Sequence, residues 1–469
     1  MRKKGTDMAD GCARSRLAER NRAFHERGTD AKAFEYIGDM DYEYNADIGL
    51  AYASPVRGVW NIVHIGTLVP GGHQIYVCPT SCLRGVVLTT AEMGRMDKLS
   101  TITVGEDNII EGNMEEQLLH GTERIIRELP ERPRMIMIFT SCVHHFLAVN
   151  YKRVYRILQK EFPDIDFVDC YMDPIMRRTA PVVPSLWRQM HRVLRPGQEK
   201  SSKQVNYIGN CFHYSSKYCD LTALLEENGI RVLEANHVRD YDEFLNMGKS
   251  SVNFYFHKTG ERAVKDLQIR LEQPYFWLRP GYSYEEYEED LSKAAEILGI
   301  SAPTSDFFER EREKTEMEIE RTKSALGDVP IAVDYTAVDQ PLELSLFLLQ
   351  HGFHVESCYQ DVFTEGEEIF QKLQREKPDL KIYGVYGWNI RGIERTHEGK
   401  IVAIGQKAAY FNGTPYFVNI VENAGSYGTD GMYGYRGLRR LMVLLREAAE
   451  EPKPMKQLVQ FKGWGCDLR

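Results

Sequence analysis

The 469-residue sequence has no uninterrupted apolar run of the length that crosses a membrane as a helix, about 18 residues or more. Its most apolar stretch, residues 58–77, is broken by Asn61, His64 and Pro70 and by several glycines. The N-terminal segment, MRKKGTDMADG, is charged and lacks the apolar centre of a signal peptide. We therefore expect a cytoplasmic protein without a transmembrane helix.

Positive charge is also in short supply. Lys and Arg number 59 against 68 Asp and Glu, which gives a formal net charge of −9 at pH 7. Nucleic-acid binding needs clustered Lys and Arg, so we expect no nucleic-acid partner. Internal repeats and low-complexity segments are absent. The phosphate-binding pattern GxxxxGK[ST] is absent too, so ATP is expected to bind to a partner protein.

Short apolar runs alternate with amphipathic helical patterns from about residue 54, which predicts βαβ units with parallel sheets. Buried strands are expected at 134–139, 204–210 and 329–334, with a loop at 140–145. A helix is expected over 16–36. The predicted organisation is an N-terminal helical extension (1–55) and three Rossmann-like α/β domains around a central cleft. These domains are residues 56–198, 199–325 and 326–469.

Three of the nine cysteines follow predicted strands. Cys78 and Cys82 stand in VCPTSC, and Cys142 stands in FTSC. Cysteines of a cytoplasmic protein are expected to be reduced thiols or metal ligands, and helix N-termini favour the thiolate. Three converging thiolates suit an iron–sulfur cluster, which normally has four Cys ligands. The fourth ligand would come from a partner subunit, a symmetry mate, an Asp or another Cys.

Two other interpretations of these cysteines stay open. Single cysteines often serve as small buried hydrophobic residues. A zinc site with Cys142, His144 and His145 is the rival metal hypothesis, although the spacing is not that of a zinc finger. The remaining cysteines are interpreted as structural: Cys12, Cys170, Cys211, Cys219, Cys358 and Cys466.

Several segments, taken in order, resemble nitrogenase component 1 and its relatives. SPVRGVWNIVHIGTLVPGGHQIYVCPTSC places Cys82 at the position of a family cluster ligand, and MIMIFTSCVHHFLAVNY does the same for Cys142. The segments TVGEDNIIEGNMEEQL, PGYSYEEYEEDLSKAAEILG, IGQKAAYFNGTPYFVNI and YGYRGLRRLM extend the likeness over about residues 54–450. The resemblance implies three Rossmann-like domains around a cleft and two such subunits, as a homo- or hetero-oligomer, with a cluster at their interface. It also implies an ATP-dependent iron–sulfur reductase as partner.

The sequence departs from the family at the metal ligands. A further cluster cysteine of nitrogenase has no counterpart in 51–54, although Cys78 is an extra cysteine that could replace it. A simple 4Fe–4S cluster is therefore favoured over a P-cluster. The segments that should hold the iron–molybdenum cofactor, 253–260 and 422–437, contain no cysteine and no histidine ligand respectively, and Ala424 stands near the histidine position. A bound iron–molybdenum cofactor of the usual kind is not expected.

Polar and aromatic side chains at the ends of predicted strands are candidates for a substrate cleft: His257, Lys258, Trp388, Asn389, Arg391, Gln406 and Lys407. The first two would bind an anionic group unless they form a solvated loop. The YGWNIR segment would line a pocket for a planar substrate. The last two would face the cleft unless they form a surface helix pair. No catalytic residue is assigned.

Three functions are compatible with this pattern. The first is a nitrogenase-like oxidoreductase subunit that passes electrons from the reductase, through the interfacial cluster, to an unidentified substrate. The second is a scaffold for metallocluster assembly without turnover. The third is a metal-free α/β binding protein with structural cysteines.

Overall fold

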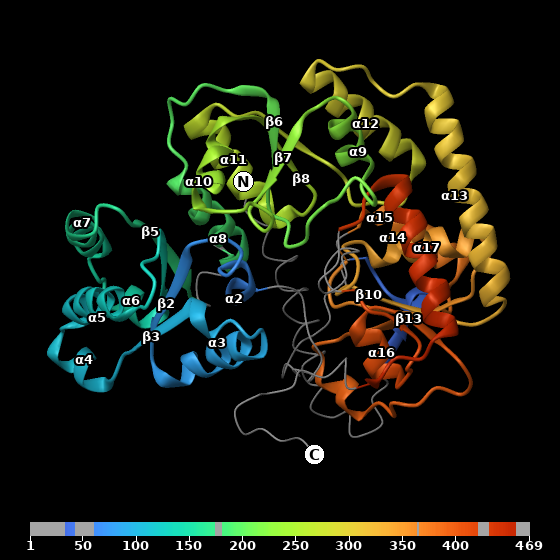
Figure 1. Ribbon diagram of the computed structural model, residues 1–469. Coiled ribbons are helices and arrows are strands. Elements are labelled where there is room, and N and C mark those ends of the chain that lie inside the picture. Colours follow the sequence, from blue (N-terminus) through green and yellow to red (C-terminus); the bar gives the residue numbers. More distant parts are fainter. Residues whose placement is uncertain (1–32, 43–60, 174–180, 364, 421–430, 456–469) are drawn as a thin grey trace, which may run out of the picture. The chain divides into compact units, whose positions relative to one another are not determined.

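The computed structural model describes residues 33–42, 61–173, 181–363, 365–420 and 431–455 (Figure 1). The chain forms two compact units. Unit 1 contains the described residues of 33–42, 318–420 and 442–455, and unit 2 contains those of 61–317 and 431–441. Together the units hold three sheets of parallel strands with helices between them, which confirms the predicted α/β class. No helix among the described residues is both long and apolar enough to span a bilayer.

The first sheet, in unit 2, has the strand order β3-β2-β4-β5, with all neighbours parallel. All seven residues of β2 and of β4 are buried, because helices cover both faces of the sheet. Residues of α5 and α7 pack with Ile75 and Val77, while residues of α2, α3 and α8 pack with Tyr76 and Cys78. The elements of this region are β2 (Gly72–Cys78), β3 (Leu99–Thr103), β4 (Met135–Ser141), β5 (Asp166–Met172), α2 (Ile62–Ile65), α3 (Thr80–Glu92), α4 (Glu106–Glu111), α5 (Met114–Glu128), α6 (Cys142–Phe146), α7 (Tyr151–Glu161), α8 (Val182–Met190), η2 (Met96–Lys98) and η4 (His191–Val193).

The second sheet, also in unit 2, has the parallel order β7-β6-β8-β9. One of its faces shares a core with the first sheet, in which Ile208 and Leu233 join Tyr76 and Phe139. The other face packs on α9 and α12. The elements are β6 (Ser201–Tyr207), β7 (Arg231–Glu234), β8 (Ser250–Tyr255), β9 (Tyr275–Trp277), α9 (Asp220–Glu227), α10 (Tyr241–Asn246), α11 (Glu261–Leu271), α12 (Tyr284–Leu298), η5 (Met247–Lys249) and η6 (Lys258–Gly260).

The third sheet, in unit 1, has the order β1-β12-β11-β10-β13-β14. Its strands are parallel except β1, which pairs antiparallel with β12. The elements are β1 (Phe34–Tyr36), β10 (Ile331–Asp334), β11 (Val355–Tyr359), β12 (Lys381–Tyr383), β13 (Val402–Ile404), β14 (Phe417–Val418), α14 (Pro341–Gln350), α15 (Glu367–Glu376), α16 (Gln406–Asn412), η1 (Ile37–Asp39) and η7 (Trp388–Gly392).

Two long helices have residues in both units: α13 (Ser305–Leu326) and α17 (Gly434–Glu450). Within unit 2, Arg439 of α17 bonds Glu311 of α13 at 2.6 Å. Within unit 1, Arg446 bonds Glu318 at 2.5 Å. Charged side chains therefore hold these two helices together inside each unit.

Two local predictions are wrong. The end of the helix predicted over 16–36 is strand β1, because Phe34 and Tyr36 pair with Tyr383 and Lys381 at the sheet edge, while 16–32 lie outside the described residues. The loop predicted at 140–145 is instead the end of β4 followed by α6. Ser141 is the N-cap of that helix, which begins at Cys142 itself.

Candidate metal centre and ligand sites

The three cysteines singled out from the sequence lie at one edge of the first sheet. Strands β2 and β4 are neighbours, with Val77 paired to Thr140. Cys78 is the last residue of β2, and Cys142 is the first residue of α6, directly after β4. Cys82 lies in the first turn of α3, where its N–H donates to Pro79 O at 2.9 Å. The parallel pairing thus brings the three positions to the carboxyl ends of adjacent strands.

The three thiols differ in exposure but act on one another. Cys78 is fully buried, Cys142 is half-buried and Cys82 is exposed. The pKa of the Cys78 thiol is raised to about 12, mainly by burial and to a smaller extent by the charges of Cys82 and Cys142. Cys78 is stable as the neutral thiol until a metal cation binds, because no positive charge compensates a buried thiolate that lies near two other thiols.

The donor set fits a multinuclear cluster better than one ion. A single zinc ion needs its donor atoms within about 2.3 Å of one point. Among the described residues, no three His, Cys, Asp or Glu side chains are gathered in that way. In the zinc hypothesis His144 would be a ligand, but its ring is buried with Nδ1 at 3.3 Å from Ser141 Oγ. A cluster of several irons spaces its thiolates more widely and takes Cys ligands.

The surroundings of the cysteines are apolar on both sides. Towards the interior, the Tyr76 ring stacks on Phe139 with centroids 4.4 Å apart, on the face of the sheet that carries Cys78. Towards solvent, Phe146 and Leu147 follow Cys142 and are 68% and 43% exposed. Large exposed apolar side chains that follow Cys142 in the chain form a surface suited to contact with another protein.

The other cysteines within the described residues are Cys170, Cys211, Cys219 and Cys358, and all four are buried. Cys170 lies on the same face of the first sheet as Cys78, where it packs near Tyr76. Cys12 and Cys466 lie outside the described residues.

At the second sheet, His257 and Lys258 follow β8 but have different surroundings. His257 is buried, with Nε2 at 3.2 Å from Tyr214 OH. Lys258 is exposed and its ammonium lies 3.2 Å from the centroid of the Trp277 ring, a cation–π contact. The solvated-loop alternative therefore holds for Lys258 only.

The same edge of the second sheet holds a cluster that the sequence analysis missed. The rings of His213 and His237 stack with centroids 3.6 Å apart, and His213 Nδ1 lies 3.3 Å from Glu234 Oε1. Glu234 is buried at the end of β7 and accepts a hydrogen bond from Asn210 at 3.0 Å. The carboxylate thereby fixes the loop after β6.

At the third sheet, Gln406 and Lys407 open α16 and are only 1% and 3% exposed, so the surface-helix alternative is wrong for both. Gln406 donates to Asn419 Oδ1 at 2.6 Å. Trp388, Asn389 and Arg391 lie in η7, where Arg391 is exposed. These five candidates belong to unit 1, whereas the cysteines, His257 and Lys258 belong to unit 2.

Lys407 belongs to a group of ionisable side chains that we call the Lys407 cluster: Asp334, Tyr335, Asp361, Tyr386 and Lys407. Of these, Asp334 and Lys407 are buried. The Lys407 ammonium lies 5.5 Å from the Tyr386 ring centroid. Burial lowers the pKa of Lys407, and the charges of Asp334 and Asp361 act in the opposite direction. Tyr335 OH donates to Tyr386 OH at 3.0 Å.

Asp334 anchors this cluster to the backbone. It is fully buried and accepts bonds from Thr336 N and Ala408 N, both at 2.7 Å, and from Thr336 Oγ1. Gly405 permits the approach, because it has a φ of +111° and any Cβ there would overlap the Asp334 carboxylate. The sequence signal was available: an apolar strand that ends in Asp-Tyr-Thr places a carboxylate at a ligand-binding edge.

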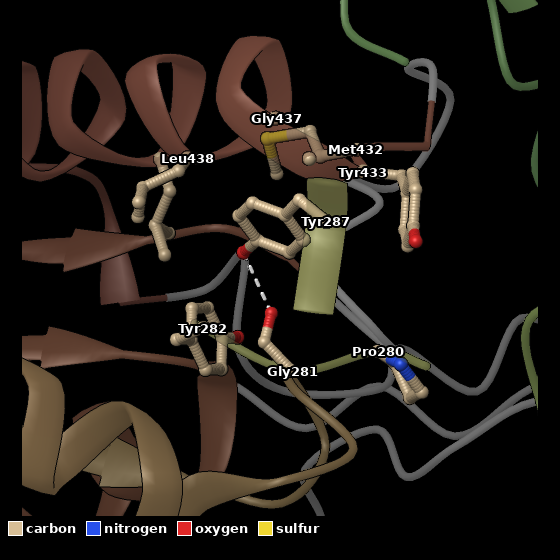
Figure 2. A pocket seen from close by; sticks show the side chains of 10 residues that line it. Pro280, Gly281, Tyr282, Tyr287, Met432, Tyr433, Gly437 and Leu438 are labelled. Atoms are coloured by element: carbon tan, nitrogen blue, oxygen red, sulfur yellow. Dashed lines mark hydrogen bonds between the residues drawn. The ribbon is translucent and has the colours of Figure 1, made fainter. Parts of the chain in front are cut away.

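A separate pocket of unit 2 lies between the loop after β9 and the start of α17 (Figure 2). Its cavity volume is about 30 Å³. Tyr287 points across it and donates to Gly281 O at 2.6 Å. The lining residues are Pro280, Gly281, Tyr282, Tyr287, Met432, Tyr433, Gly434, Gly437, Leu438 and Leu441, and none is a predicted site residue.

Comparisons with known proteins identify a family and a fold. A family model described as nitrogenase component 1 type oxidoreductase matches residues 64–447. A solved structure of nitrogenase Cp1 at pH 6.5 is similar, with a TM-score of 0.63 and 14% identity over 85% of this chain and 94% of that chain. A structure of nitrogenase Cp1 at pH 5 gives a TM-score of 0.56 and 12% identity over 87% and 90%. At these identities the likeness is one of fold. No curated protein matches the sequence.

Proposed function

Because this chain belongs to the family of nitrogenase component 1 type oxidoreductases, we propose that it passes electrons from an ATP-dependent iron–sulfur reductase to a substrate. The route is an iron–sulfur cluster, favoured as 4Fe–4S, held by Cys78, Cys82 and Cys142. The observation that supports this proposal is the placement of the three cysteines at one edge of the sheet: Cys78 ends β2, Cys82 follows in the first turn of α3, and Cys142 directly follows β4. A bound cluster supplies one-electron redox chemistry.

The protein's own contribution is to hold the thiols and to control water. Cys78 is buried against the Tyr76–Phe139 stack, so water is excluded on the inner side. Cys82 is exposed, so the outer side is open. A fourth ligand and a cover from outside the chain would complete the site, which favours a second component 1-like subunit, as homo- or hetero-oligomer. The exposed Phe146 and Leu147 suit that contact.

An iron–molybdenum cofactor of the usual kind is not part of this proposal. The segment 253–260 offers His257 in place of a cysteine, and this ring is already bonded to Tyr214. The segment 422–437 contains no histidine in the sequence, and residues 421–430 lie outside the described residues. The substrate is therefore expected to bind without that group.

The test is the iron and acid-labile sulfide content of anaerobically purified protein, with electron paramagnetic resonance after reduction. Cys82→Ala and Cys142→Ala are expected to lose the iron and the signal. Cys358→Ala, which removes a buried thiol in the third sheet, is the matched control and is expected to keep both. A protein without iron after anaerobic reconstitution would overturn the proposal. A protein that holds the cluster but never oxidises its reductase would instead support the assembly-scaffold hypothesis.

A further inference from the structure

A row of aromatic rings runs from the core of unit 2 towards its surface. We call this row the tyrosine chain, and its members in spatial order are Tyr214, Phe256, Tyr433, Tyr287, Tyr435 and Tyr284. Centroids of successive rings lie 4.1 to 5.8 Å apart, and Tyr433 and Tyr287 are drawn in Figure 2. The first five rings are buried, whereas Tyr284 is half-buried. Contacts of this kind are ordinary packing, so the rings alone indicate no function.

The hydroxyl groups at the surface end of the chain donate to carboxylates. The bonds run from Tyr433 to Asp290 at 2.9 Å, from Tyr435 to Glu288 at 2.7 Å and from Tyr284 to Glu316 at 2.8 Å. Arg279 lies 3.1 Å from Asp290 and Arg312 lies 3.0 Å from Glu288, so the charges of these two carboxylates are compensated. Phenylalanine would fill the same space without burying a polar group. The phenols and their carboxylates therefore call for an explanation beyond packing.

The remaining members of the chain differ in whether a base lies beside them. Tyr214 OH lies 3.2 Å from Nε2 of His257, whose neutral ring is a base. Tyr287 donates to the backbone carbonyl of Gly281, which is not a base at neutral pH. Phe256 has no hydroxyl group. Four tyrosines therefore have a proton acceptor, and no more than one ring without a base separates them along the chain.

Such an arrangement suits the transfer of a radical from ring to ring. Tyrosine loses an electron readily only if it loses its phenol proton in the same step, because the oxidised phenol is a strong acid. A base within hydrogen-bond distance takes up that proton directly. Burial raises the pKa of the Tyr433, Tyr435 and Tyr284 phenols, so each holds its proton until it is oxidised.

We propose that the tyrosine chain carries single oxidising equivalents from the core of unit 2 to Tyr284, where they are discharged. The oxidant is a strong radical, such as the hydroxyl radical that ferrous iron forms with hydrogen peroxide. It takes one electron from a buried tyrosine and becomes hydroxide, while the phenol proton moves to the neighbouring base. This activity goes beyond electron delivery to a substrate and does not need the iron–sulfur cluster.

Each further step moves one electron and two protons locally. The electron passes from the next tyrosine to the tyrosyl radical, and the donor's phenol proton moves to its own base. The reduced phenol regains its proton from the base beside it. At Tyr284 a thiol supplies the last electron, releases its proton and becomes a thiyl radical. The net reaction converts a hydroxyl radical and a thiol into water and a thiyl radical, and every tyrosine is restored.

The test is run from the surface end, because transfer between tyrosines is reversible. Full-length protein is treated with ruthenium(III) tris(bipyridine), generated by a laser flash in the presence of persulfate. This one-electron oxidant is too bulky to enter the core, so it acts on half-buried Tyr284. Tandem mass spectrometry maps the oxidised tyrosines, and we expect oxidation of buried Tyr433. In Tyr435→Phe, oxidation of Tyr433 should fall about tenfold while that of Tyr284 persists, because one step of the chain is lost.

A second variant separates radical transfer from packing. Glu288→Gln keeps every ring in place but removes the proton acceptor of Tyr435, and it should lower the oxidation of Tyr433 to a similar extent. Tyr359→Phe, at a buried tyrosine of the third sheet, is the matched control and should leave it unchanged. The proposal is overturned if Tyr433 is not oxidised in the wild type, or if both chain variants match the wild type. Cys142→Ala should show the wild-type pattern, which keeps this test independent of the electron-transfer proposal.

Discussion

The cysteine edge of the first sheet and the Lys407 cluster of the third sheet occupy equivalent places, at the carboxyl ends of parallel strands, but are built in opposite ways. The cysteine edge has thiols that range from buried Cys78 to exposed Cys82, with apolar neighbours and few hydrogen bonds. The Lys407 cluster has buried ions, and Asp334 is held by three hydrogen bonds. The cysteine edge is suited to a site that a ligand and a surface from another chain complete. The Lys407 cluster is largely complete within one unit, so its members are expected to matter more for folding.

The largest expected effect is a loss of stability when Asp334 of the Lys407 cluster is replaced. Asp334→Ala leaves the N–H groups of Thr336 and Ala408 unbonded and removes a counter-charge of Lys407. Each buried group left without its partner costs about 1–3 kcal/mol, so we expect a loss of about 3 kcal/mol or more in the free energy of unfolding measured with urea. Asp379→Ala, at a 67% exposed carboxylate, should change it by about 0.5 kcal/mol or less. An equal loss of unfolding free energy in the two variants would contradict a stabilising role of the buried Asp334 carboxylate.

The second effect is the loss of stability of unit 2 at acidic pH. Burial lowers the pKa of His191 from 6.5 to about 4, and the hydrogen bond to Trp187 O opposes this only in part. Between pH 6.5 and pH 4 the imidazole therefore takes up a proton in the unfolded chain but not in the folded protein. The contribution of neutral His191 to the free energy of unfolding is complete above pH 6.5 and is lost as the pH falls towards 4. It amounts to about 3 kcal/mol.

In His191→Phe, the fall in the free energy of unfolding between pH 6.5 and pH 4 should be smaller by about that amount. Urea midpoints at a series of pH values measure it. His120→Phe, at an exposed ring on α5, is the control and should keep the wild-type slope. A wild-type slope in both variants would show that His191 titrates normally.

The third effect lies within the cysteine edge. In metal-free protein, Cys78→Ala should lower the free energy of unfolding by about 1 kcal/mol, because a fully buried side chain loses packing. Cys82→Ala should change it by less than about 0.5 kcal/mol, because that residue is exposed. Both should lose iron on reconstitution. We therefore expect the free energy of unfolding and the iron content to vary independently among the cysteine variants. A large loss of stability in Cys82→Ala would show that the cysteine edge, like the Lys407 cluster, is needed for folding.

The smallest effect on stability belongs to Phe146. Because this ring is 68% exposed, Phe146→Ser should alter the free energy of unfolding by about 0.5 kcal/mol or less. We expect it to weaken subunit association, measured by sedimentation velocity over a range of concentrations. Ile269→Ser, at an 82% exposed residue of α11, is the matched control. Equal association in both variants would show that Phe146 lies outside the subunit contact.

Local patterns in the sequence were enough to predict the positions of the central strands β4, β6 and β10. The amphipathic pattern of residues 284–298, followed by Gly299, predicts a helix, and α12 covers the same residues and ends at Gly299, whose φ of +65° costs glycine no strain. The strand prediction at 134–139 matches β4 because a strand buried on both faces is a continuous apolar run. Strand β1 was missed because its conformation comes from pairing with β12, about 350 residues away in the chain.

The same division applies to the candidate sites. The sequence by itself determined which chemistry is available: thiols after strands, a lysine in IGQK and no phosphate-binding loop. Only the tertiary structure decided which of these groups meet. Parallel pairing of β2 with β4 brought the thiols to one edge, and burial turned Lys407 from a helix-surface residue into the partner of Asp334 and Asp361. The physical reason is that the type of a residue determines its charge and its pKa in water. Its exposure in the folded protein, and the opposite charges that compensate its own, depend on neighbours from distant segments of the chain.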